Sequence, residues 1–113
     1  MGANGKRALF ETLRSIDSAT FTGVYQAVGT PLLYPSVLMK FVNNTSSLVT
    51  VSIDGVNAHD ILPADSFSLY DYGSDAQDSC GDHRLALGQG TQIWVKASAG
   101  AGSFYVVTIY QGP

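Results

Sequence analysis

The residues of this chain that could carry chemistry are one cysteine, two histidines and a group of aspartates. Cys80 and His83 have the spacing C-x-x-H, which fits a nucleophile with its base or half of a metal site completed by His59 and an aspartate. The sequence has no Gly-x-Ser-x-Gly elbow, and both histidines stand beside aspartates in segments typical of loops. Paired carboxylates of the glycosidase kind would need apolar burial that these acids lack. We therefore expect no catalytic residue, no metal site and no cofactor.

The charged residues are segregated along the chain. Seven of the nine acids lie between Phe41 and His83, where there is no Lys or Arg. Four of them could gather a calcium ion but lack the D-x-D-x-D-G order of a calcium loop: Asp71, Asp75, Asp78 and Asp82. The first 16 residues are basic. A basic arm and an acidic body favour contacts between neighbouring copies, whereas solvated acidic loops are the simpler alternative.

Aromatic residues are the remaining candidates for binding. Five of them could line a carbohydrate platform, anchor contacts between subunits or fill a core: Tyr70, Tyr72, Trp94, Tyr105 and Tyr110. The first possibility makes a carbohydrate-binding module the alternative function from another class.

Composition limits the elements that can position these residues. The 113 residues suffice for one domain, and 45% of them are hydrophobic but only 13% charged. Glu occurs once and Lys plus Arg total 6, so the chain is too poor in these residues for many surface helices. The absence of a basic stripe argues against nucleic acid, and no apolar run approaches a membrane span. The N-terminal residues do not resemble a signal peptide, so we expect no export route.

Hydrophobic periodicity predicts a short amphipathic helix followed by strands. Leu9, Leu13 and Ile16 form a helical stripe within residues 8–16. Alternation then indicates about seven strands: 24–28, 37–42, 49–54, 56–62, 67–70, 93–96 and 104–110. The last is aromatic and β-branched throughout, as expected for a strand buried on both faces. We predict an all-β antiparallel sandwich, immunoglobulin-like or jelly-roll-like, at residues 21–113, with a helical or extended arm at residues 1–20.

Three finer predictions follow from this pattern. Asp54-Gly55 is expected to form a two-residue hairpin turn. One core should contain Val49, Val51, Ile53, Phe67, Leu69, Ile93, Val95, Val106 and Ile109. The apolar stripe of the arm should dock on a neighbouring subunit rather than on its own body. The predicted interface residues are Arg7, Leu9, Leu13, Arg14, Ile16, Asp71, Asp75, Asp78, Asp82 and Trp94.

The strand pattern resembles that of a small all-β structural protein of tailed-bacteriophage virions. The resemblance covers about residues 37–111 and lies in the order of several short segments: Phe41-x-Asn43, Val49-x-Val51-Ser52-Ile53-Asp54-Gly55, His59-Asp60-x-Leu62-Pro63-Ala64, Tyr70-Asp71, Gly90 to Lys96, Tyr105-Val106 and Ile109-Tyr110.

The resemblance implies a non-enzymatic virion component that assembles as a homo-oligomer in the host cytoplasm. It implies a position at the head–tail neck or collar, with capsid decoration or tail-fibre attachment as alternatives. The implied partners are further copies of the chain and portal, adaptor, tail or capsid proteins, with no role for nucleic acid or membrane. The family assigns no binding residue to this sequence.

Overall fold

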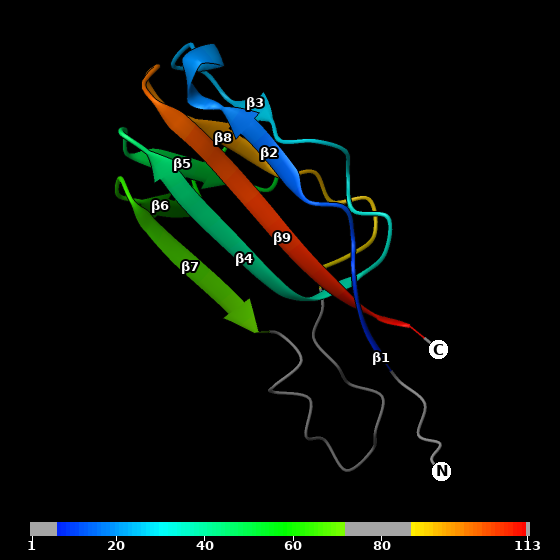
Figure 1. The fold of residues 1–113 in the computed structure, drawn as a ribbon. Coiled ribbons are helices and arrows are strands. Elements are labelled where there is room, and N and C mark those ends of the chain that lie inside the picture. The colour runs from blue at the N-terminus through cyan, green and yellow to red at the C-terminus, as the bar shows by residue number, and fades with distance from the viewer. Residues whose placement is uncertain (1–6, 72–86, 113) are drawn as a thin grey trace.

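Two antiparallel sheets packed face to face form the molecule (Figure 1). The computed structural model describes residues 7–71 and 87–112. The larger sheet has the order β1-β9-β4-β7, and β2 pairs with β9 beside β1. Its strands are β1 (Arg7–Phe10), β2 (Arg14–Asp17), β4 (Ser36–Thr45), β7 (Ser66–Asp71) and β9 (Gly102–Gly112). The predicted all-β sandwich is therefore confirmed.

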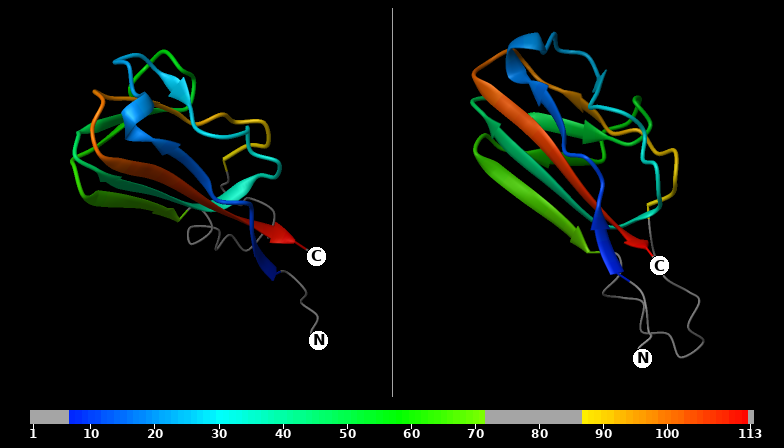
Figure 2. Two further views of the ribbon diagram at one scale, coloured as in Figure 1. Left: turned by 45° about the horizontal axis from the view of Figure 1, so that its top comes forward. Right: turned by 45° about the vertical axis from the view of Figure 1, so that its right-hand side comes forward.

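The smaller sheet lies on one side of the larger sheet, as the two views of Figure 2 show. Its order is β3-β8-β5-β6, and its strands are β3 (Gln26–Ala27), β8 (Trp94–Lys96), β5 (Val49–Ser52) and β6 (Asp60–Leu62). A 3-10 turn, η2 (Ser18–Thr20), leads from one sheet toward the other. The longest strand, β9, pairs with β1, β2 and β4 and so organises the larger sheet.

The core fills the space between the sheets. Alternation places Met39 and Phe41 of β4 and Phe104 and Val106 of β9 on the inner face of the larger sheet. The buried apolar residues facing them and closing the ends are Phe21, Val28, Leu32, Val49, Val51, Leu62, Ile93, Val95 and Ala97. Asn43 is buried among them and is fully used: its amide donates to the carbonyls of Ser47, Leu62 and Pro63.

The helix expected at residues 8–16 is wrong, because this segment forms β1 and β2. Its Leu9 and Ile16 lie opposite Tyr110 and Phe104 of β9. A helix of two turns is marginal in isolation, whereas both strands pair with β9 over their whole length. Residues 7–10 and 14–17 thus pair with β9 of their own chain. Docking of this segment on a neighbouring subunit stays a prediction.

The predicted core is partly wrong. Val49, Val51, Ile93, Val95 and Val106 are buried as expected. However, Ile53 lies in an exposed loop, Ile109 is only half-buried, and β7 presents Phe67 and Leu69 to the outside. In β7 the inner positions belong instead to Ser66, Ser68 and Tyr70, which lie opposite Asn43, Phe41 and Met39 of β4.

The two-residue turn at Asp54-Gly55 is wrong as well. Residues 53–59 form a longer loop, and only Asp60–Leu62 returns as β6. Gly55 has φ +77°, but the Asp54 carboxylate accepts from the backbone N–H groups of Val56 and Asn57. These bonds hold the pKa of Asp54 far below its usual range. The loop is therefore held by the side chain of Asp54 and not by the predicted two-residue hairpin turn.

Candidate interaction surface

The outer face of the larger sheet carries a continuous set of apolar side chains. The strand register arranges them in three rows across the sheet. The rows are Phe10–Ile109–Leu38, then Val107–Lys40–Leu69, then Tyr105–Val42–Phe67. We call these nine residues the outer patch. Phe10, Phe67 and Leu69 are 68%, 66% and 54% exposed.

The outer patch is as apolar as the inner face of the same sheet. Inward, β4 and β9 present Met39, Phe41, Phe104 and Val106 together with the polar Asn43 and Thr108. Outward, the corresponding positions of the patch hold one charged residue, Lys40. In Figure 1 the face of β4, β7 and the middle of β9 turned to the viewer is crossed by no other described segment. Apolar patches of several hundred Å² mark interaction sites on soluble proteins.

The sequence contained the signal for this patch. Residues 104–110 are apolar at odd and even positions, which predicted a strand buried on both faces. Among the described residues, only the inner face is covered. Phe67 and Leu69 were assigned to the core because alternation identifies an apolar face without saying on which side of the sheet it lies.

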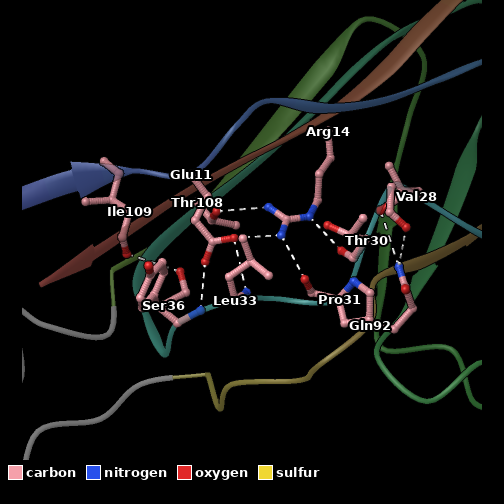
Figure 3. Close-up of polar contacts among 12 residues, drawn as sticks. Glu11, Arg14, Val28, Thr30, Pro31, Leu33, Ser36, Gln92, Thr108 and Ile109 are labelled. Atoms are coloured by element: carbon pink, nitrogen blue, oxygen red, sulfur yellow. Dashed lines mark hydrogen bonds and ion pairs between the residues drawn. The ribbon is translucent and has the colours of Figure 1, made fainter.

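A second feature is a buried ion pair between Glu11, which lies between β1 and β2, and Arg14, the first residue of β2 (Figure 3). Arg14 was predicted as an exposed interface charge, but it is 5% exposed and forms an ion pair with Glu11, which is 9% exposed, at 2.7 Å. The guanidinium also donates to the carbonyls of Thr30 and Pro31. Its remaining partner is the Thr108 hydroxyl of β9, at 3.3 Å.

Glu11 completes this clamp from the other side. Its carboxylate accepts from the backbone N–H groups of Leu33 and Tyr34, at 3.2 and 3.1 Å. Burial raises the pKa of Glu11, but the bond from Arg14 and the two backbone bonds outweigh it and leave the pKa below its usual value. The pair therefore fastens the 30–34 segment to the edge of the larger sheet, a structural role that the sequence did not predict.

The other predicted interface residues are scattered. Leu9 packs against Gly112, and Ile16 is half-buried against the core. Leu13 is exposed and lines an open hollow with Leu33. Arg7 begins β1 and Asp71 ends β7, at opposite edges of the larger sheet. The predictions for Asp75, Asp78, Asp82 and the Cys80–His83 pair lie outside the described residues.

The four described aromatic candidates do not share a surface. Trp94 lies on the outer face of the smaller sheet and contacts Gly55. Tyr105 belongs to the outer patch, Tyr70 points between the sheets to Asp60, and Tyr110 stacks on Tyr34 with ring centroids 4.0 Å apart. Burial and the neighbouring Tyr34 raise the pKa of Tyr110. A platform built from all four is therefore not formed.

The hollows lined by described residues are open or small. A cavity of about 150 Å³ between the sheets is lined by His59, Asp60 and Tyr70, and sites for small molecules usually measure about 300 Å³ or more. Two larger hollows, of about 440 and 490 Å³, are open to solvent; one lies beside Glu11 and Arg14 and the other beside Lys96. Within residues 7–71 and 87–112 no three potential ligands come together to hold a metal ion. In the same residues, no helix has the length and hydropathy to cross a membrane.

Comparison of the chain with protein-family models, with curated proteins and with solved structures finds no match.

Proposed function

We propose that this chain is a non-enzymatic structural subunit of a tailed-phage particle, a homo-oligomer at the head–tail neck or collar. The observation that carries the proposal is the outer patch, which offers apolar area on a rigid sheet rather than a cleft for a substrate. Such a surface suits association with other proteins, because burial of apolar area is the main driving force of assembly. The sequence resemblance over residues 37–111 supplies the setting.

The proposal defines how the subunit works. It acts by occupying a position and binding neighbours, which are further copies and portal, adaptor, tail or capsid proteins of the virion. Pairwise contacts need only modest affinity, because repetition in a closed oligomer multiplies weak contacts into a stable assembly. The particle would assemble in the host cytoplasm.

The experiment is to purify particles, identify this chain in them by mass spectrometry and locate it by electron microscopy with a tagged copy. We expect the chain at the neck. Density on the capsid surface or at the fibre attachment site would replace the neck by the decoration or attachment alternative. Absence of the chain from particles of a host lysate that contains it would refute the proposal.

A further inference from the structure

We infer that the outer patch is a self-association surface, on which a second copy of this chain packs with its own outer patch. This inference rests on the proposed function for its setting and names the partner of the same surface. The contact would be isologous, with the two larger sheets packed face to face as the middle layers of a four-layer dimer.

The size of the patch fits a weak self-contact. Each side chain on one face of a sheet occupies about 4.8 Å by 6.7 Å, so the nine residues cover roughly 300 Å² in projection. Two corrugated faces of this size would bury roughly 800 Å² of accessible surface, the range of weak and transient contacts. The contact would therefore hold as a weak dimer alone and firmly within a larger assembly.

The composition of the patch matches a second copy better than other parts of the chain. Residues 1–6 and 72–86 contain few large apolar residues, and the second segment includes Asp75, Asp78 and Asp82. A second copy, in contrast, brings eight apolar side chains on a sheet with the same twist. Lys40 is the single charge of the patch, and its long stem can cover apolar surface while the ammonium reaches the rim.

Charge lies at the rim of the patch. Asp71 of β7 lies opposite Leu38 and extends the first row on the outer face. Arg7 lies opposite Gly112 and three residues from Phe10, so alternation turns its side chain to the other face of β1. The apolar rows therefore supply the affinity of the contact.

The test measures self-association of the full chain by sedimentation velocity over a wide concentration range. We expect a reversible dimer that Phe67→Ser and Leu69→Ser each weaken at least tenfold. Ile61→Ser is the matched control, because Ile61 is 55% exposed on an edge strand of the other sheet and lies outside the patch. Circular dichroism and thermal melts check that every variant is folded.

A chain that stays monomeric at several hundred micromolar, or a dimer that Ile61→Ser weakens as much as Phe67→Ser, overturns the inference. Failure is separable from that of the proposed function, because a monomeric chain found in particles refutes only the self-contact, and a dimer absent from particles refutes only the phage role.

Discussion

Replacement of Glu11 by Gln isolates the energetic role of the Glu11–Arg14 clamp. The Glu11 carboxylate accepts three N–H groups, from Arg14, Leu33 and Tyr34. The Gln side chain has the same shape but only one acceptor oxygen. Its NH2 group takes the place of the second oxygen and cannot accept a hydrogen bond from a neighbouring N–H group. Breaking a buried ion pair costs about 3 to 5 kcal/mol. Arg14 keeps its bonds to Thr30 and Pro31, so we expect a loss of about 3 kcal/mol, the lower end of that range.

The stability difference between the wild type and Glu11→Gln should depend on pH. The pKa of Glu11 is lower in the folded protein than its usual value of 4.5. Stability from the ionised group is therefore fully present above pH 4.5 and is lost as the pH falls through the folded pKa. The difference in stability between the wild type and Glu11→Gln should be constant from pH 7 to about 5 and should shrink below that, because a protonated Glu resembles Gln.

Urea unfolding followed by tryptophan fluorescence measures this difference at a series of pH values. At pH 7 the midpoint of Glu11→Gln should lie at least about 1 M below that of the wild type, given typical urea slopes. Other carboxylates also titrate, but they are common to both proteins and cancel in the comparison. A stability difference below about 0.5 kcal/mol at pH 7, or one that does not change down to pH 3, would refute the role assigned to the clamp.

Three further predictions concern the fold. Val51→Ala should cost about 2 kcal/mol or more in urea unfolding, because Val51 is fully buried between the sheets and leaves a cavity, and a cost of a few tenths would place its face in solvent. Gly102→Ala should destabilise the protein far more than Gly23→Ala in thermal melts. The two glycines have similar φ angles, +90° and +84°, but only at Gly102 would an added Cβ meet a backbone carbonyl, that of Asn44. Equal losses of stability would contradict this close approach of the two backbones. Asn43→Leu should cost roughly 3 kcal/mol by leaving buried carbonyls unpaired, and near-wild-type stability would show that water replaces them.

Alternation in the sequence predicted the sandwich and several strands. Val49 and Val51 of β5 and Val95 of β8 were assigned to the correct face, since only one side of the smaller sheet is apolar there. Local composition also identified β4, β7 and β9, because β-branched and aromatic residues fit a pleated surface whatever covers it.

The errors arose where tertiary contacts override local pattern. The spacing of Leu9 and Ile16 fits a helix, but it also fits two strands separated by an interruption, and only the pairing with β9 decides between them. No sequence signal marked Arg14 as buried apart from its spacing of three residues from Glu11, which a helix would have explained equally well. The outer patch was missed because the sequence showed two apolar faces and the sandwich needed only one.

The position of β9 in the larger sheet has a consequence for synthesis of the chain. Among the described strands β9 is made last, yet β1, β2 and β4 all take it as their hydrogen-bonding partner. Val106 pairs with Arg14, so the ribosome adds about 90 residues between them, which takes roughly 5 to 20 seconds at usual elongation rates. During this interval the strand edges that β9 will cover are unpaired, and both faces of β4 are open to contact with other chains. The nascent chain is therefore most vulnerable to misassembly just before its final strand emerges.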